Sequence, residues 1–392
     1  MKFSGLIALA SAALFGAANA QTTDIVSALV GYTKNNASII TGLAASSPLL
    51  STIKSAKNIT LFIPTNDAVA KLPASVLAQL SDQTVVDTVL SYHAVPGISF
   101  VPSADADLFV PTALADANLT VSGDGYQVVN VVVSGGKVVL NHGVANGPAK
   151  VIDSVVATNG VIHIVDTVLL PPVSVSQTAT AAGLTTLVDT LVSAKLASID
   201  SLKEVTIFAP TNAAFNTTLA ALKSANVSLN LAQLQATLGI HVVPGVYHST
   251  DLLKLAPVAL SIGTYGGENI TIEVDTTGVY VAGAGNSVAA RVVTADVLVN
   301  SGVVHVIDTV LLPSTKLLTS LASNTDGLTV SQLNPVTPAV LGKTFTVPTP
   351  SAAAPSPSTT GSAPAPKSAA GRTVTSASLV LGFSAIAAVL FL

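Results

Sequence analysis

Apolar positions follow two different spacings along this chain, and the pair of spacings occurs twice. In residues 25–30, and again in residues 184–192, Val, Leu and Ile recur every three to four residues, as on one face of a helix. Residues 60–63 and 205–209 predict short strands, each ended by a proline that lacks the N–H donor a central strand needs. Residues 85–90 then predict a helix that leads into His93.

The second half of each copy is rich in Val and Ile and is interrupted by Gly and Asn, which predicts strands joined by turns. In the first copy we expect strands at residues 126–133, 137–140, 151–156 and 161–168, with a hairpin turn at Ser134-Gly135-Gly136. The second copy repeats them at residues 270–274, 279–282, 292–299 and 303–310. Helices followed by strands predict an α+β domain, present in tandem.

Three motifs recur in the same order. Residues 161–171 read Val-Ile-His-Ile-Val-Asp-Thr-Val-Leu-Leu-Pro, and residues 303–313 differ from them only by exchanges of Val and Ile. Thr-x-Phe-x-Pro-Thr-Asn-x-Ala begins at Thr60 and at Thr206, and His-x-Val-Pro-Gly begins at His93 and at His241. The copies lie about 145 residues apart, which is an ordinary domain size. We place the domains at residues 22–172 and 173–315, and each should bury its own core.

These motifs resemble those of the fasciclin (FAS1) family over roughly residues 22–315. The resemblance implies that each domain has a compact β-sheet core with helices packed over it. It also implies an extracellular adhesion module that binds surface proteins, matrix or polysaccharide. The Tyr-His segment of the family is associated with adhesion, which gives as candidates Tyr92, His93, Pro96, His241 and Pro244. Ile240 replaces the tyrosine of this segment in the second copy.

The histidines are interpreted as structural residues. His163 and His305 each stand three residues before an aspartate in a strand, where the two side chains point to opposite faces and cannot form one metal site by themselves. In such apolar strands we expect each histidine to be hydrogen bonded. Tyr92 equally fits a core position with its hydroxyl satisfied. His142 and His248 have no counterpart in the other copy and are expected at the surface.

Composition narrows the possible functions. The chain has no cysteine, which excludes disulfides, thiolate metal sites and cysteine nucleophiles. Charged residues make up 9% and the net charge is −4, without a basic patch, so nucleic acid is not an expected partner. Motifs of hydrolases, nucleotide-binding proteins and zinc proteases are missing from the sequence, so we expect no enzyme, no cofactor and no metal. An enzyme acting on wall polysaccharide stays as a minor alternative.

Both ends of the chain carry targeting signals. Residues 1–20 read as a signal peptide with a small-residue cleavage site at Ala18-Asn19-Ala20. Residues 316–370 are predicted to be a disordered stalk rich in Ser, Thr and Pro, with the character of an O-glycosylated segment. Residues 371–392 end in an uncharged apolar run and read as a removed GPI-attachment signal, with Ser368 as the attachment residue. A short membrane anchor is the alternative.

Secretion makes the sequons relevant. Six Asn-x-Ser/Thr sequons occur, at Asn36, Asn58, Asn118, Asn216, Asn226 and Asn269. The sequence places Asn118 and Asn269 at the same point of the two copies. Together these features predict a GPI-anchored glycoprotein of the outer leaflet or cell wall, similar to fungal fasciclin-like surface proteins. We expect it to bind surface or matrix proteins and polysaccharides, and to self-associate weakly. The alternative is a structural wall mannoprotein without a specific partner.

Overall fold

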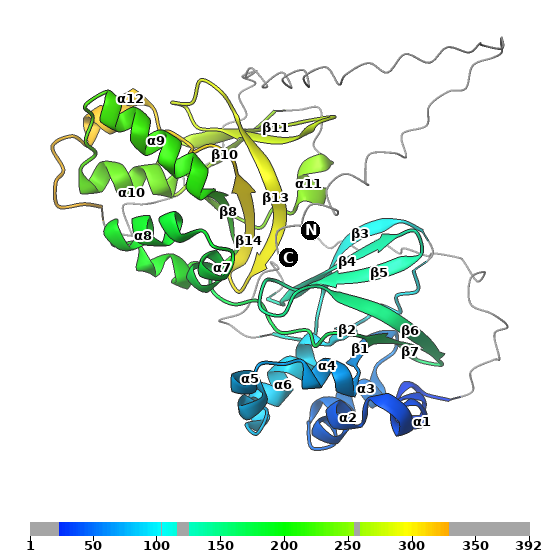
Figure 1. Cartoon of the computed structure of the whole chain (residues 1–392). Helices are drawn as coiled ribbons and strands as arrows, with labels where there is room; N and C mark the ends of the chain where they lie inside the picture. Colours follow the sequence, from blue (N-terminus) through cyan, green and yellow to red (C-terminus); the bar gives the residue numbers. More distant parts are fainter. Residues whose placement is uncertain (1–22, 103, 116–124, 255–258, 329–392) are drawn as a thin grey trace, which may run out of the picture.

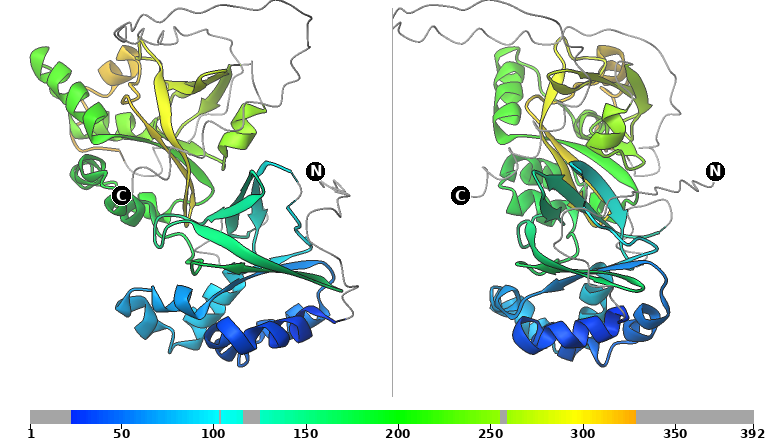
Figure 2. Two further views of the ribbon diagram at one scale, coloured as in Figure 1. Left: turned by 45° about the vertical axis from the view of Figure 1, so that its right-hand side comes forward. Right: turned by 90° about the vertical axis from the view of Figure 1, so that its right-hand side faces the viewer.

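Each copy of the repeat folds as an α+β domain built on one seven-stranded sheet (Figure 1). The computed structural model describes residues 23–102, 104–115, 125–254 and 259–328. The helices of domain 1 lie on the side of its sheet that faces away from domain 2, and the two further views agree on this arrangement (Figure 2). The predicted fold class is therefore confirmed, and the strands of the two domains approach each other.

The predicted elements of domain 1 occur in the predicted order, with further helices and strands between them. The helices are α1 (Ile25–Asn36), α2 (Ser38–Ala44), α3 (Leu49–Ser55), α4 (Asn66–Ala70), α5 (Ala74–Gln79) and α6 (Gln83–Tyr92). The strands are β1 (Ile59–Pro64), β2 (Ala94–Pro96), β3 (Ala106–Pro111), β4 (Val128–Ser134), β5 (Lys137–Asn141), β6 (Ala149–Ala157) and β7 (Gly160–Val165).

Domain 2 repeats this order with different helices. They are α7 (Val175–Ala181), α8 (Thr185–Ser193), the 3-10 helix η1 (Ala197–Ser201), α9 (Asn212–Ser224), α10 (Leu231–Gly239), α11 (Ser249–Leu253) and α12 (Thr315–Ser320). The strands are β8 (Val205–Pro210), β9 (Val242–Pro244), β10 (Leu260–Gly263), β11 (Asn269–Asp275), β12 (Gly278–Ala282), β13 (Ala290–Val299) and β14 (Gly302–Ile307).

The sheets share one topology, β2-β1-β7-β6-β5-β4-β3 in domain 1 and β9-β8-β14-β13-β12-β11-β10 in domain 2. The two most similar motifs of the repeat lie side by side, because β1 runs parallel to β7 and β8 runs parallel to β14, whereas every other pairing is antiparallel. Pro64 and Pro210 end β1 and β8, where the chain turns into a helix capped by the threonine that follows.

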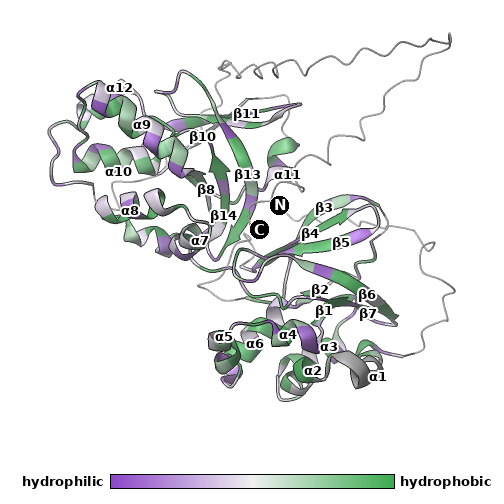
Figure 3. Ribbon diagram, in the orientation of Figure 1, coloured by the Kyte–Doolittle hydropathy of each residue, from purple (hydrophilic) through white to green (hydrophobic). Residues whose placement is uncertain are grey.

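Two apolar layers stabilise each domain. On one face of the central strands of domain 1, Ile162 and Ile164 pack against residues of the helices such as Ile25. On the other face, Phe62 and Val165 pack inside the curved sheet. Domain 2 has the same two layers. Figure 3 shows the strands mostly in the hydrophobic colour and the helices with both colours, as expected when only one helix face is buried.

The sequence missed four short strands, β2, β3, β9 and β10, because each has three to six residues and too few alternations to stand out. It also placed the end of domain 2 too early. Helix α12 begins at Thr315 and continues to Ser320, and the carbonyls of Leu318 and Leu321 accept hydrogen bonds from Gln233 and Asn230. Leu328 also bonds to Gln235, so residues at the start of the predicted stalk pack against domain 2 as far as residue 328.

The two predicted targeting signals, the predicted attachment residue Ser368 and most of the predicted stalk lie outside the described residues. Within the described ranges, no helix has the length and apolar character needed to cross a membrane.

Candidate interaction site

His93 and His241 occupy the same place in the two domains. Each ring follows the long helix before the Pro-Gly turn, with Nδ1 donating to a carbonyl of that helix, 2.7 Å to Val89 and 2.8 Å to Thr237. Nε2 then accepts the backbone N–H of the repeated Leu-Leu-Pro segment, at 3.0 Å from Leu169 and 2.9 Å in domain 2. Burial lowers the pKa of each histidine to about 4, so both rings are neutral at pH 7.

Tyr92 is also a core residue. Its ring is fully buried and its hydroxyl donates to the carbonyl of Val128 at 2.9 Å, which joins the end of α6 to the start of β4. This burial corrects the expectation for Tyr92, His93 and His241. Side chains with almost no exposed surface cannot contact a partner while the protein is folded, and these three hold the helix to the sheet instead.

The prolines of the same segment lie closer to solvent. Pro96 is exposed and begins an exposed turn that continues through Ile98, whose side chain is 37% exposed. Pro244 is half-buried. Of the candidates that the resemblance implied, only these prolines remain accessible, and the exposed part of the segment is the turn after β2.

The two His-x-x-Asp motifs have the structural role that the sequence predicted. His163 donates and accepts at its two ring nitrogens, with Ser154 Oγ at 2.7 Å and the Phe100 carbonyl at 2.9 Å. The neighbouring Asp166 points elsewhere and accepts the backbone N–H of Lys150 at 2.8 Å, across the bulge of β6. In domain 2, Asp308 accepts the backbone N–H of Arg291 in the same way. His305 again donates to a backbone carbonyl, that of Tyr247, but its Nδ1 accepts the backbone N–H of Asp296 in place of a serine hydroxyl. Among the described residues, no group of His, Asp and Glu has the arrangement of a metal site.

His142 and His248 are buried, not at the surface, which corrects the prediction for both. Nδ1 of His142 bonds to the Leu170 carbonyl at 3.1 Å. His248 lies between the domains. Its ring stacks on Phe109 of β3 with centroids 3.7 Å apart and planes 9° from parallel. We expected both histidines at the surface because neither has a counterpart in the other copy. A residue that only one copy contains can instead mark a contact outside the shared domain framework, and for His248 this signal was present in the sequence.

The contact between the two domains, which we call the seam, also has an apolar part beside the Phe109–His248 stack. Val128 of β4 and Leu298 of β13 are both buried, in one cluster with Phe109 and Val246. The loop after β5 also approaches β13 closely. A Cβ added to Gly143, whose φ is 99°, would lie 3.1 Å from the Leu298 carbonyl oxygen. The seam therefore contains close-packed side chains from both domains.

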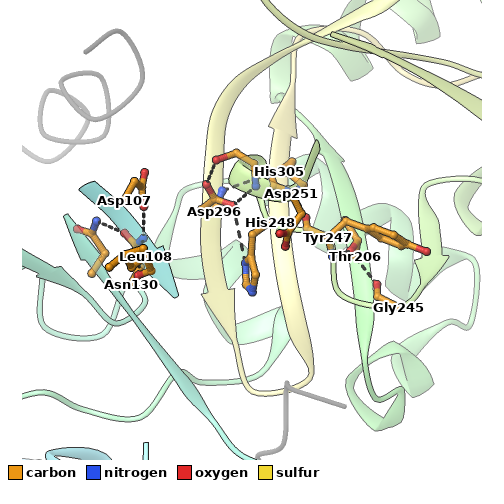
Figure 4. A network of polar contacts seen from close by, with 12 residues as sticks. Asp107, Leu108, Asn130, Thr206, Gly245, Tyr247, His248, Asp251, Asp296 and His305 are labelled. Atoms are coloured by element: carbon orange, nitrogen blue, oxygen red, sulfur yellow. Dashed lines mark hydrogen bonds and ion pairs between the residues drawn. The ribbon is translucent and has the colours of Figure 1, made fainter. Parts of the chain in front are cut away.

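Charged groups flank the seam (Figure 4). Asp296 has a φ of 60° at the bulge of β13, and its carboxylate accepts the Ser249 N–H at 2.8 Å and the Ser249 hydroxyl. One oxygen lies 3.9 Å from His248 Nδ1, yet burial still lowers the pKa of His248 to about 4. Across the seam, burial raises the pKa of Asp107, and the negative charge of Asp296 adds to that rise against a hydrogen bond from Asn130.

The sequons differ in accessibility. Asn58, Asn216 and Asn226 have exposed side chains. Asn269 is half-buried and its Nδ2 donates to Ser261 Oγ at 3.1 Å. Asn36 is the last residue of α1, and Asn118 lies outside the described residues. The strand registers place Asn269 at the position of Val128, not of Asn118. Val128 begins β4, which pairs with the edge strand β3, and Asn269 begins β11, which pairs with the edge strand β10.

The sequence profile of the Fasciclin domain matches residues 35–171 and 182–313, more than half of the chain and one stretch in each structural domain. The chain belongs to the fasciclin domain family. The three repeated motifs, which hold β1 to β7 and the helix before Pro-Gly to the Leu-Leu-Pro segment, are thus the internal framework of a fasciclin domain. The seam joins two such domains.

Named relatives are similar to this fasciclin pair. A "Fasciclin-like arabinogalactan protein" of Arthroderma benhamiae is 31% identical over 265 residues, which cover 66% of this chain and 59% of that protein. Human "Periostin" is 29% identical over 177 residues, which cover 44% of this chain and 19% of that protein. The chain therefore spans about three fifths of the first relative. A solved FAS1 domain pair of the insect cell adhesion molecule Fasciclin I aligns with a TM-score of 0.35 and 20% identity, over 73% of this chain and 99% of that one.

Proposed function

We propose that this protein is a cell-surface glycoprotein that mediates adhesion, or association with wall or matrix, through its two fasciclin domains. The observation that carries the proposal is family membership across both domains, with each repeated motif used to build the domain. The buried residues of the framework leave recognition to the outer surface, where Pro96 and Ile98 are exposed in domain 1 and Pro244 is half-buried in domain 2. Expected partners are surface proteins and polysaccharides.

The name of the fungal relative, a fasciclin-like arabinogalactan protein, supports a place at the surface of a secreting cell. The predicted signal peptide and GPI signal fit the same location, with anchorage in the outer leaflet of the plasma membrane. The proposed role is non-enzymatic. Tethering two domains on one stalk raises the effective concentration of the second contact, so each contact can be weak.

The adhesive proposal is tested with a soluble fragment, residues 21–328, on arrays of wall polysaccharides and on surface protein extracts. We expect specific binding that decreases when Ile98→Asp places a charge in the exposed turn after β2. Leu77→Asp is the matched control, because Leu77 is 38% exposed on α5, close to the 37% of Ile98. Absence of specific binding would instead favour a structural wall mannoprotein.

Anchorage is tested on intact cells. Phosphatidylinositol-specific phospholipase C should release the protein, since a GPI anchor holds it by its lipid alone. Replacing Ser368 and the small residues behind it should prevent attachment. Retention after phospholipase treatment, with Leu392 detected by mass spectrometry, would show a membrane anchor made of protein.

A further inference from the structure

The seam uses a different face of each domain. Domain 1 contributes an edge formed by Phe109 of β3 and Val128 of β4. Domain 2 contributes a platform formed by His248, Leu298 and the half-buried Val246. Since the domains share one topology, each also contains the counterpart of the face that it does not use in the seam.

The counterpart of the platform is open on domain 1. Leu298 pairs with Val303 in the sheet, and Val156 pairs with Val161, the same position of the repeated motif. Leu298 is fully buried under domain 1, whereas Val156 is 49% exposed. Ile98, in the turn that corresponds to that of Val246, is 37% exposed. Val156 and Ile98 form what we call the open face.

The counterpart of the edge is altered on domain 2. Phe109 pairs with Asn130 and Val128 with Pro111, and the equivalent register of β10 and β11 places Ser261 and Asn269 at the positions of Phe109 and Val128. Both are polar, they are hydrogen bonded to each other, and Asn269 is a sequon. Domain 2 therefore lacks an apolar edge, and within this chain the edge that fits an open face is that of domain 1.

We propose that the open face of domain 1 is a docking site for the Phe109–Val128 edge of a second copy of this chain, in the arrangement that the seam has within one chain. The contact joins an edge to a different face, so it is heterologous and extends head to tail. The proposal deepens the adhesive function, because it names a second copy of this chain as a partner for the surface that includes the exposed turn after β2. Only the biological use of the contact rests on the proposed adhesive function.

Docking within the chain competes with docking between chains. The linker between the domains is short, because β7 and the start of α7 are separated by residues 166–174, so domain 2 is present at a high effective concentration beside the edge of its own domain 1. A free chain in dilute solution is therefore closed at its seam. Association between chains requires release of the edge, which is favoured where anchored copies are crowded on one surface.

The experiment releases the edge in the full chain. Leu298→Asp places a charge in the apolar part of the seam and should free Phe109 and Val128. We expect this variant to form concentration-dependent dimers and larger species in sedimentation velocity, while the wild type and the control Val288→Asp, changed at an exposed residue of domain 2, stay monomeric. Adding Val156→Asp should weaken the association at least about tenfold, as expected for an apolar residue central to a contact.

His248→Ala, which removes the ring stacked on Phe109, opens the seam independently and covers the case in which Leu298→Asp does not fold. Scattering profiles show whether the domains have separated. An opened variant that stays monomeric, or one whose association is unchanged by Val156→Asp, overturns the proposal. Binding of the wild-type fragment to wall polysaccharide or surface protein does not require self-association, so failure here is distinct from failure of the adhesive function.

Discussion

Acidification should destabilise this protein through its buried histidines, and His241 gives the clearest case. Its ring is buried, which lowers its pKa from the ordinary 6.5 to about 4 against the opposing hydrogen bond to Thr237. Protonation also removes the acceptor at Nε2 that receives the Leu311 N–H. The folded state therefore selects the neutral ring, whereas the unfolded chain binds a proton near pH 6.5.

The sign follows from these two values. The contribution of the neutral ring is fully present above pH 6.5, and it is lost as the pH falls toward 4, because only the unfolded chain takes up the proton in that interval. The gap corresponds to about 3 kcal/mol for this one histidine, at about 1.4 kcal/mol per pH unit. His93, His142 and His248 have pKa values lowered to about 4 for the same reason and add to the effect.

Urea unfolding of the full chain at several pH values between 7 and 4.5 measures this dependence. We expect the free energy of unfolding to decrease with falling pH, and the slope to be smaller by about one proton in His241→Leu. That variant should also be less stable at pH 7 by roughly 1–3 kcal/mol, since the Leu311 N–H loses its acceptor. Stability that is flat over this interval, or a His241 ring resonance that titrates near pH 6.5 in the folded protein, would refute the reasoning.

Two further predictions concern single side chains. Tyr92→Phe should lower the free energy of unfolding by about 1 kcal/mol, because the Val128 carbonyl loses a buried donor. Binding per folded molecule should stay unchanged. Thermal unfolding and array binding measure the two effects, with Tyr126→Phe at an exposed tyrosine as the control. For glycosylation, peptide mass spectrometry after enzymatic deglycosylation should find high occupancy at Asn226, which is exposed, and lower occupancy at Asn269, whose Nδ2 is engaged by Ser261. Equal occupancy at both residues would show that this hydrogen bond does not limit modification.

The repeat allowed the fold to be predicted in outline. Helical spacing in residues 25–30 and Val-rich segments in residues 126–168 identified the α+β class because these periodicities reflect burial on one face or both. The binding candidates were misjudged. Tyr92 and His93 were candidates because the family resemblance implied a role in adhesion, yet both side chains are buried and join the helix to the sheet.

The sequence by itself determined what is local or repeated: two domains, their longer strands in order, and the hydrogen-bonded role of His163 and His305 in apolar strands. Only the tertiary structure decided which faces meet. Phe109, His248 and Leu298 are far apart in the chain and belong to no shared motif, and their contact depends on how two complete sheets dock. Burial of a side chain between domains is set by that docking, and no periodicity within either domain encodes it.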